Sequence, residues 1–466
     1  MTKAPADLVH RLRLHGQGHL LHGWASLSPA ARIAFVDQLA GIDFAELEAL
    51  YNRRNEPHTV LPSREQIAPL PVEDGASIPA SAVQRGEAAL RAGQVAALVV
   101  AGGQGSRLGF EKPKGMFPIG PVSGASLFQF HAEKVLALSR KFGAPMPLLV
   151  MTSHATHAET EAFFQEHSFF GLAPEQVTFF QQGTMPALDL ATGQLLLEKP
   201  GMLFLSPNGH GGTLTALADS GLLADLKARG VKHVFYFQVD NPLVTIADPA
   251  FVGRHIETDS EVSSKVVFKE RAEEKVGVLA LVNHRCGIIE YSDLPRDLAE
   301  ERDDDGILQY RAGSPAIHVF SVPFLERVTR GAERLAFHTA RKKVPHFDVT
   351  TGTTTNPDLE NALKFELFVF DALPHAERWL AVSVNRDDEF APLKNATGAD
   401  SATAVQQAMT NLAARWLRQA GVTVPTGTTD PIEISPLFAL TPEECATKLP
   451  QGFRIAGPTL LRNDVS

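Results

Sequence analysis

The chain has 466 residues, of which 44% are hydrophobic and 21% are charged, and its formal net charge at pH 7 is −10. This length predicts two to three domains with an ample hydrophobic core. The acidic balance argues against a general nucleic-acid binder, because such proteins need a basic surface to neutralise phosphates. If the substrate is a polyanion, the cations that bind it must be concentrated locally.

The cysteine count and the lack of long apolar runs indicate the compartment. Two cysteines, Cys286 and Cys445, are too few for a disulfide framework or a four-cysteine zinc site. A reducing compartment is the simplest inference. The first residues lack the apolar core of a signal sequence, and no run of about 18 apolar residues could span a membrane. We therefore expect a cytoplasmic protein with no membrane partner.

Residues 1–92 are predicted to form a helical N-terminal extension. Ser28 followed by Pro29 is typical of a helix start, and apolar residues follow at helical spacing over 33–39. A second helix is expected over 44–51, and several prolines then indicate an extended connection. The extension contains no catalytic constellation, and its clustered histidines are more simply explained as solvated or capping side chains than as ligands.

Residues 93–398 are predicted to form a central domain in which strand and helix signals alternate. This alternation is typical of a mostly parallel sheet covered by helices, so the expected fold class is α/β with a Rossmann-like core. Loops that follow such strands meet at one edge of the sheet, which predicts a single ligand site there. Residues 399–466 are predicted to form a small C-terminal α/β subdomain that begins with a helix over 403–421. The expected strands cover 98–100, 147–152, 177–182, 231–239, 264–268, 276–282 and 287–291.

The most informative stretch directly follows the first of these strands. It reads Ala-Gly-Gly-Gln-Gly-Ser-Arg-Leu-Gly from Ala101 to Gly109, and Lys112 and Lys114 come soon after. Glycines let the backbone approach a phosphate and point N–H groups at it, while cations neutralise its charge. We therefore predict a nucleotide-phosphate loop, with an ordinary turn and solvated cations as the alternative. The spacing fits no Walker A motif, and Leu108 stands where a dinucleotide fingerprint needs its third glycine.

This stretch resembles the signature loop of the UDP-N-acetylhexosamine pyrophosphorylases, members of the UTP:sugar-1-phosphate uridylyltransferase family. Their loop is close to Leu-x-x-Gly-Gly-Gln-Gly-Thr/Ser-Arg-Leu-Gly followed by Pro-Lys-Gly, and further motifs extend the resemblance over residues 95–400. The resemblance implies that residues 93–398 are a catalytic uridylyltransferase domain with a nucleotidyltransferase core. It also implies nucleotide-binding roles for Ala101, Gly102 and Gly103, and catalytic roles for Arg107 and Lys114.

Two more polar stretches follow predicted strands. The triplet Gln-Gln-Gly at 181–183 also occurs in the family, where its second glutamine, here Gln182, contacts uracil; an amide offers the donor and acceptor that this edge needs. The stretch Pro-Asn-Gly-His-Gly-Gly-Thr at 207–213 precedes a helical pattern, which suits an anion or a nucleotide ring. We expect Gly209 and His210 to bind the nucleotide, although the family has asparagine in place of the histidine.

Asp240 directly follows an apolar strand, within the sequence Val-Asp-Asn that the family shares. A carboxylate at a strand end suits Mg²⁺, which prefers one or two carboxylates together with phosphate oxygens. The alternative is a simple turn residue. Together with the two phosphate-type loops, the pattern predicts that Asp240 is the metal ligand and that Mg²⁺ is the cofactor.

The resemblance also implies a sugar pocket. Glu290 can accept hydrogen bonds from two sugar hydroxyls, and Gly277 leaves room for an N-acetyl group. Phe368 and Phe370 are predicted to be apolar walls of the sugar site, with burial in a strand or helix as the alternative. The basic stretch 335–343 is interpreted as an exposed helix face. The chain departs from the family at His210, Ser314 and Ile317, which leaves the preferred sugar open. The implied sugar-binding residues are Gly277, Glu290, Tyr291, Ser314, Phe368 and Phe370.

The segment from Arg386 to Asn395 resembles the family's Arg-x-Asp-Glu-Phe-x-Pro-Leu-Lys-Asn almost residue for residue. Its Lys394 can act as a point charge on a phosphate. We therefore expect Lys394 to be a catalytic residue that holds the phosphate of the sugar-1-phosphate.

These assignments together predict a UTP:sugar-1-phosphate uridylyltransferase that forms a UDP-sugar and pyrophosphate by in-line displacement at the α-phosphorus. The attacking phosphate is already a dianion near neutral pH, since its second pKa is about 6, so no general base is needed. Two alternatives stay open: an enzyme for glucose-1-phosphate or galactose-1-phosphate, and a non-catalytic nucleotide-sugar sensor. We expect UTP and a sugar-1-phosphate as partners, and a monomer or a weak homo-oligomer.

Overall fold

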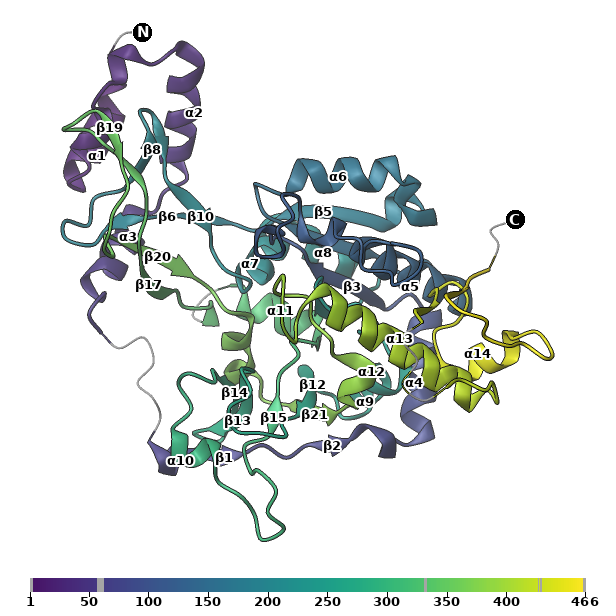
Figure 1. The fold of residues 1–466 in the computed structure, drawn as a ribbon. Helices are drawn as coiled ribbons and strands as arrows, with labels where there is room; N and C mark the ends of the chain where they lie inside the picture. Colours follow the sequence, from purple (N-terminus) through teal and green to yellow (C-terminus); the bar gives the residue numbers. More distant parts are fainter. Residues whose placement is uncertain (1–2, 57–62, 331–332, 426, 428–429, 464–466) are drawn as a thin grey trace. The chain divides into compact units, whose positions relative to one another are not determined.

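A computed structural model of the chain describes residues 3–56, 63–330, 333–425, 427 and 430–463, and it has an α/β fold (Figure 1). The chain divides into two compact units. Residues 63–92, predicted as part of the N-terminal extension, belong to the second unit, and two stretches of the predicted central domain belong to the first. Unit 1 comprises Met1–Leu61, Gln182–Gly212 and Leu335–Val369, and unit 2 comprises Pro62–Gln181, Thr213–Arg334 and Phe370–Ser466.

Among the described residues, unit 2 contains a 12-stranded sheet with the path β1-β13-β15-β12-β16-β11-β3-β4-β5. Strands β11, β3, β4 and β5 pair in parallel, and the predicted site loops follow them. Beyond β11 the sheet is mixed, because β16 runs antiparallel to both β11 and β12 whereas β21 runs parallel to β12. The predicted α/β class is therefore confirmed, with a parallel sheet where the site loops leave it. The strands are β1 (Ile67–Pro69), β2 (Glu73–Asp74), β3 (Val95–Val100), β4 (Leu148–Thr152), β5 (Val177–Gln181), β11 (His233–Gln238), β12 (Val262–Phe268), β13 (Val278–Val282), β14 (Arg285–Ile289), β15 (Ala312–Gly313), β16 (His318–Ser321) and β21 (Trp379–Ser383).

Helix α5 (Leu127–Phe142) shows how local sequence sets the element boundaries. Its N-cap Ser126 accepts a hydrogen bond from the Gln129 N–H at 3.1 Å, and Gly143 ends it with φ 68°. The Gln129 side chain donates to Glu133 rather than back to the cap, so only half of a capping box forms. The helices of unit 2 include α4 (Ala80–Arg91), α6 (His157–Glu166), α8 (Leu222–Ala228), α9 (Pro249–Glu257), α10 (Arg296–Ala299), α11 (Val322–Val328) and α12 (Arg386–Glu389), while α7 (Gly212–Asp219) begins at the last residue of unit 1.

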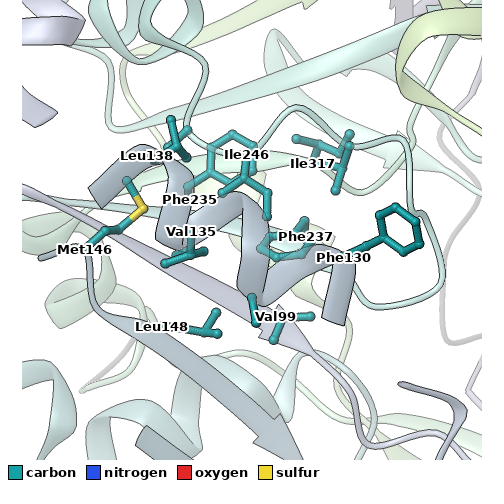
Figure 2. Packing of buried hydrophobic residues seen from close by; sticks show 14 of the residues in the cluster. Val99, Phe130, Val135, Leu138, Met146, Leu148, Phe235, Phe237, Ile246 and Ile317 are labelled. Atoms are coloured by element: carbon teal, nitrogen blue, oxygen red, sulfur yellow. The ribbon is translucent and has the colours of Figure 1, made fainter. Parts of the chain in front are cut away.

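The main core of unit 2 packs helix α5 against the parallel strands (Figure 2). Val135 of α5, Val99 of β3 and Phe237 of β11 are each at most 1% exposed. Ile317, which the sequence suggested lies near the sugar, belongs to this core and is 1% exposed. An apolar side chain just ahead of a central strand packs inward, so core packing accounts for isoleucine at this position.

The C-terminal part of unit 2 has an apolar cluster of its own, formed by Leu417, Ile432 and Cys445 with their neighbours. It contains α13 (Ala402–Gln419), which matches the predicted helix over 403–421, together with α14 (Pro442–Lys448), β22 (Ile432–Ile434) and β23 (Thr459–Leu461). Across the described residues, no helix is long and apolar enough to cross a membrane.

Unit 1 packs N-terminal helices against small sheets. Phe35 and Leu47 lie in one apolar cluster with Leu363 and Phe365 of β20. The basic stretch interpreted as a helix face is instead strand β17, paired antiparallel with β20; that prediction was wrong, because a pairing partner more than twenty residues away decided its conformation. The elements are α1 (Ala6–Leu14), α2 (Pro29–Ala40), α3 (Phe44–Asn52), β6 (Thr184–Pro186), β7 (Leu188–Asp189), β8 (Leu197–Lys199), β9 (Met202–Leu203), β10 (Leu205–Pro207), β17 (His338–Lys342), β18 (His346–Asp348), β19 (Thr353–Thr355) and β20 (Ala362–Glu366).

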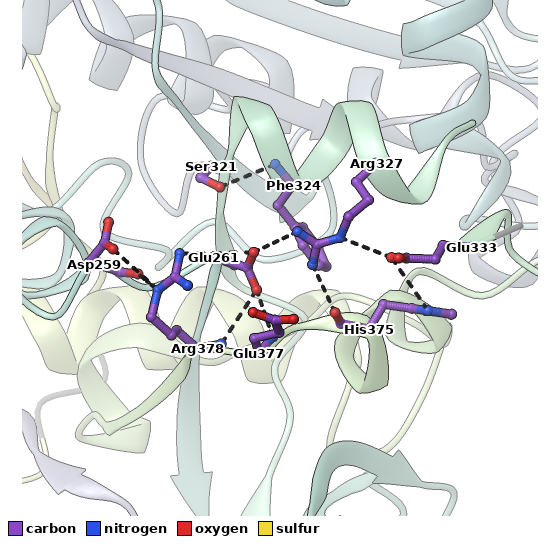
Figure 3. Close-up of polar contacts among 9 residues, drawn as sticks. All are labelled: Asp259, Glu261, Ser321, Phe324, Arg327, Glu333, His375, Glu377 and Arg378. Atoms are coloured by element: carbon purple, nitrogen blue, oxygen red, sulfur yellow. Dashed lines mark hydrogen bonds and ion pairs between the residues drawn. The ribbon is translucent and has the colours of Figure 1, made fainter. Parts of the chain in front are cut away.

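A polar cluster lies where β12 begins (Figure 3). Glu261 accepts hydrogen bonds from Arg327 Nη1 and from the Glu377 N–H, each at 2.6 Å. Arg327 in turn pairs with Glu333 at 2.9 Å. Strand register places Val262 beside Phe320, and Phe320 beside Val234 near the start of β11. This cluster therefore lies at the end of the sheet opposite Asp240. We call Glu261, Arg327, Glu333 and Arg378 the Glu261 cluster.

Candidate active site

The glycine-rich loop leaves the fully buried strand β3 and folds back on itself. The Gly105 N–H donates to Lys112 O at 2.9 Å, and the Lys114 N–H donates to Gly103 O at 3.0 Å. The Ala101 N–H donates to Met151 O of β4, which anchors the start of the loop. In the part of the chain that the structure describes, the N–H groups of Gly102 and Gly103 have no hydrogen-bond partner. They are thus available to an anion.

The loop's glycines serve different purposes. A Cβ at Gly115 would lie 2.2 Å from the Phe128 ring, so packing requires glycine there. At Gly103, no described heavy atom beyond its chain neighbours lies within 4 Å of a built Cβ, and the residue is not among those with positive φ. Neither packing nor conformation therefore explains glycine at 103, whereas close approach by a ligand does.

The two cations predicted for this loop have different surroundings. Arg107 lies on a single 3-10 turn, is exposed, and has no ion pair with any described residue. Lys114 is mostly buried; its Nζ lies 3.4 Å from Asp240 Oδ2 and 3.4 Å from Leu393 O. The fold thus brings Lys114 and Asp240 together although they are 126 positions apart in the chain.

Asp240 lies just beyond the carboxyl end of β11, on a loop held from helix α5. His131 of α5 bonds through Nε2 to Val239 O at 2.9 Å, and Lys134 donates to Val244 O at 2.8 Å. Burial, helped by the charge of Lys134, lowers the pKa of His131 to about 3, so the imidazole is neutral at pH 7. The neutral ring therefore donates its Nε2–H to the Val239 carbonyl and fixes the backbone that precedes Asp240.

The donor set at Asp240 is compatible with magnesium. Within the described ranges, no three His, Cys, Asp or Glu side chains gather into a group that could hold a metal ion. A Mg²⁺ ion that is coordinated largely by water and substrate phosphates needs only one or two protein carboxylates. Asp240, 16% exposed on its side chain and at the edge where the parallel strands end, fits that requirement.

Part of the predicted sugar pocket comes together in unit 2. The Ser314 N–H donates to Gly277 O at 2.9 Å, and a Cβ at Gly277 would lie 3.4 Å from Glu290 Oε1. Burial raises the pKa of Glu290, the charge of Asp293 adds to the rise, and the charge of Lys394 opposes it. The predicted phosphate lysine is therefore within electrostatic reach of the predicted sugar carboxylate.

The remaining predicted pocket residues of unit 2 are less informative. Tyr291, next to Glu290, is 47% exposed. Phe370 is half-buried and packs against a cluster that contains Leu70 and Leu279, so the fold alone accounts for it. Their sugar-binding roles stay predictions.

In unit 1 the second glycine-rich loop packs against the end of β20. The Leu367 N–H donates to Asn208 O at 2.7 Å, and Gly209 has φ 84°, with a built Cβ only 2.4 Å from Leu367 O. Here glycine is required by both conformation and packing. His210 Nδ1 accepts a hydrogen bond from the Val369 N–H at 3.3 Å.

Two predicted ligands of unit 1 lie on or next to this loop. The rings of His210 and Phe368 lie 5.4 Å apart between centroids, so the structure brings these two side chains together. Gln182 is 9% exposed, and the following Gly183 accepts a hydrogen bond from the Asn208 N–H. The roles of Gln182, Gly209, His210 and Phe368 in binding nucleotide or sugar stay predictions.

Three residues that organise the Asp240 loop had no predicted role: Asn241, Lys265 and Glu389. Asn241 Nδ2 donates to Glu389 O at 2.7 Å, and Lys265 is paired with the Glu389 carboxylate. One signal for them was present: Lys265 is a lone cation inside the short run Val-Ser-Ser-Lys-Val-Val-Phe of a predicted buried strand. A cation buried in a strand needs an opposite charge beside it, so this pattern predicts a buried carboxylate from another part of the chain.

Comparison with known proteins identifies the family of this chain. A family model described as UTP--glucose-1-phosphate uridylyltransferase matches residues 44–424. The chain belongs to this family, and it is an enzyme of the UTP:sugar-1-phosphate uridylyltransferase class. The family resemblance seen in the sequence motifs is thereby confirmed.

Within this family, the chain is similar to proteins named for N-acetylated amino sugars. The chain is 38% identical over 433 residues to the UDP-N-acetylglucosamine pyrophosphorylase of Saccharomyces cerevisiae, covering 88% of this chain and 91% of that protein. It is 36% identical over 495 residues to the UDP-N-acetylhexosamine pyrophosphorylase-like protein 1 of Homo sapiens, covering 98% and 97%. The structure of the uridine diphosphate N-acetylglucosamine pyrophosphorylase from Trypanosoma brucei superposes with a TM-score of 0.81 at 28% identity, covering all of both chains.

Proposed function

We propose that the chain transfers a uridylyl group from UTP to N-acetylglucosamine-1-phosphate or a closely related hexosamine-1-phosphate, releasing pyrophosphate. The observation that carries this proposal is the meeting of Lys114 and Asp240, 3.4 Å apart, where the glycine-rich loop leaves the sheet. A phosphate-type loop, a cation and a carboxylate at one edge suit a magnesium nucleotide. The names of the relatives in Saccharomyces cerevisiae and Trypanosoma brucei support an N-acetylated amino sugar.

The chemistry needs positioning and charge neutralisation more than proton transfer. An oxygen of the sugar phosphate attacks the α-phosphorus of UTP in line, the bond from that phosphorus to the bridging oxygen breaks, and pyrophosphate leaves with the electron pair. The attacking phosphate is largely ionised at neutral pH, because its second pKa is about 6. No general base is therefore assigned.

The residues of unit 2 divide this work. The N–H groups of Gly102 and Gly103 bind phosphate oxygens, and Arg107 and Lys114 neutralise the charge that develops on the leaving pyrophosphate. Lys394 holds the phosphate of the sugar-1-phosphate. Asp240 would hold Mg²⁺, which supplies further neutralisation of phosphate charge when bound.

Glu290 and Gly277 are assigned to the sugar. When ionised, the Glu290 carboxylate accepts hydrogen bonds from two sugar hydroxyls. A side chain at Gly277 would crowd both Ile288 Cγ2, at 2.8 Å from a built Cβ, and the Glu290 carboxylate. Packing against Ile288 and Glu290 therefore accounts for glycine at 277, and we place the N-acetyl group of the sugar near Gly277 on the family resemblance alone.

The test is to measure pyrophosphate release with Mg²⁺, N-acetylglucosamine-1-phosphate and each of the four common ribonucleoside triphosphates, with mass spectrometry of the product. We expect a UDP-sugar, and turnover with UTP at least about tenfold faster than with the other nucleotides, because the nucleobase is contacted by hydrogen bonds. Binding of a UDP-sugar without any turnover would instead indicate a nucleotide-sugar sensor. A cytoplasmic location and a monomeric or weakly associating state stay predictions.

A further inference from the structure

A lysine in the middle of the large sheet carries its charge in complete burial. Lys265 of β12 has no exposed surface, and its Nζ donates to both carboxylate oxygens of Glu389, at 2.6 and 2.8 Å. Asp248 lies 3.5 Å from the same nitrogen. Burial lowers the pKa of Lys265, but the charges of Glu389 and Asp248 outweigh it and raise the pKa, so the lysine is charged.

Glu389 belongs to the segment that leads to the predicted phosphate lysine. It ends the short helix α12, and Lys394 follows five positions later. At the start of that helix, Arg386 pairs with Glu274 at 2.8 Å, on the loop that precedes Gly277. Arg415 of α13 holds Asp388. The segment 386–395 is therefore fixed at its beginning by ion pairs on two sides.

The same segment is joined to the Asp240 loop by backbone hydrogen bonds. Asn241, 2% exposed, donates through Nδ2 to Glu389 O at 2.7 Å and accepts through Oδ1 from the Ala391 N–H at 3.1 Å. The Leu393 N–H donates to Asp240 O at 2.8 Å. The chain that carries Lys394 is therefore hydrogen-bonded directly to the loop that carries Asp240.

Stability alone does not explain a buried ion pair at this place. Removing two charges from water is costly, and apolar residues of similar volume often serve a fold equally well or better. Lys265 and Glu389 contact neither Arg107 nor Lys394 in the described contacts; what they hold is the position of helix α12 on β12. A buried Lys265–Glu389 pair is explained if the reaction depends on where helix α12 lies on β12.

We propose that Lys265 and Glu389 are positioning residues for uridylyl transfer: by fixing α12 on β12 they set the placement of Lys394 relative to Asp240. This inference rests on the proposed function. The pair holds the Glu389 carbonyl and the Ala391 N–H where Asn241 meets them, and Asn241 adjoins Asp240 directly. Losing the pair displaces the attacking phosphate from the line of displacement, while the N–H groups of Gly102 and Gly103, which are assigned to UTP and lie outside segment 386–395, stay in place.

The experiment compares Glu389→Gln, Lys265→Met and the double variant Lys265→Met/Glu389→Leu with the wild type. For each protein, kcat, the KM values for UTP and the sugar phosphate, and the denaturant midpoint are measured. We expect each single variant to lose about 10²-fold in kcat, the scale of an ångström-level misplacement, with the KM for UTP changed by less than about threefold. The double variant leaves Asp248, whose side chain is 28% exposed, without the Lys265 cation but buries neither member of the Lys265–Glu389 pair alone; it should regain most of the wild-type denaturant midpoint but not the wild-type kcat.

Glu261→Gln is the matched control. Glu261 is a buried carboxylate, 7% exposed against 8% for Glu389, and it adjoins the same strand at the opposite end of the sheet. We expect this variant to lower the denaturant midpoint and to keep kcat within about twofold of the wild type, a bound set by its lack of contact with the site. A Glu389→Gln variant with the kcat of Glu261→Gln, or a double variant with full kcat, would overturn the proposal. Absence of turnover in the wild type would instead overturn the proposed function, and this inference with it.

Discussion

Two buried carboxylates paired with cations contact strand β12, and the two pairs have different consequences. Just before the first residue of the strand, the Glu261 cluster joins β12 to α11 and to the chain that enters β21 (Figure 3). In the middle of the strand, Lys265 and Glu389 hold the segment that reaches Lys394, and Asn241 continues the contact to Asp240. We call the first the Glu261 end and the second, which leads to Asp240, the site end; the same chemistry stabilises the fold at one and sets site geometry at the other.

Exposure to water separates the two pairs further. The side chains of Arg327 and Arg378 are 35% and 49% exposed, so solvent screens the cations of the Glu261 cluster. Lys265 is 0% exposed, and water cannot replace its partner. Breaking the pair at Lys265 therefore changes local structure more than breaking the pair at Glu261 does.

The largest effect is expected at the site end, for Arg107→Ala. Arg107 is exposed beside the open N–H groups of the loop, and its charge is assigned to the leaving pyrophosphate. We expect kcat to fall by about 10²- to 10³-fold, the scale for loss of a preorganised charge-stabilising donor. Time courses of pyrophosphate release measure this directly. Arg327→Met, in the Glu261 cluster, serves as the control. Turnover within twofold of the wild type would remove Arg107 from the mechanism.

A smaller and more selective effect is expected for Lys394→Ala. Because this lysine is assigned to the sugar phosphate alone, binding of the sugar-1-phosphate should weaken by about 10- to 10²-fold, as for loss of a charge-assisted hydrogen bond. UTP binding, measured by calorimetry, should change little. The assignment is contradicted if calorimetry shows the reverse order.

Acid should destabilise the site end through His131. The pKa of His131 is about 3 in the fold against 6.5 unfolded, so only the unfolded chain takes up this proton between those values. Stability is therefore lost as the pH falls below 6.5, by about 2 kcal/mol for this one group between pH 7 and pH 5. Urea unfolding at both pH values, in the wild type and in His131→Gln, tests the sign. An equal loss in both proteins would show that His131 is not responsible.

The smallest effect on activity is expected at the Glu261 end. Glu261→Gln removes a charge-assisted bond to Arg327, and we expect the free energy of unfolding to fall by about 1–3 kcal/mol. Activity per folded molecule should stay within about twofold. Thermal unfolding followed by assays of pyrophosphate release at 25 °C provides both numbers. A tenfold loss of kcat would mean that the two ends of β12 are not functionally distinct.

Sequence reasoning located the local features of this molecule because their causes are local. The buried run of β3 and the Ser28 cap of α2 each depend on residues within a few positions. The Lys114–Asp240 contact was also within reach, because loops after parallel strands share one edge. The family motifs added a predicted ligand group for each of these loops.

The features that sequence reasoning missed depend on distant partners. Lys265 and Glu389 are 124 positions apart, and a lysine in a strand does not show which carboxylate it will meet. Strand β17 forms because β20 supplies its hydrogen bonds, and its own basic residues give no sign of that pairing. Thr156 and Glu159 have the spacing of a capping box at the start of α6, but the Thr156 hydroxyl accepts the Ser153 N–H at 3.0 Å instead. A competing local bond decided that case.

The proposal that this enzyme serves N-acetylated amino sugars is tested most directly by one ratio. It is kcat/KM for N-acetylglucosamine-1-phosphate divided by kcat/KM for glucose-1-phosphate, measured with UTP and Mg²⁺ in the wild type. Because the named relatives in Saccharomyces cerevisiae and Trypanosoma brucei support an N-acetylated amino sugar, we predict a ratio above about 10, the discrimination that contacts to a few extra atoms provide. A ratio at or below one would contradict the assignment and favour a glucose-1-phosphate enzyme.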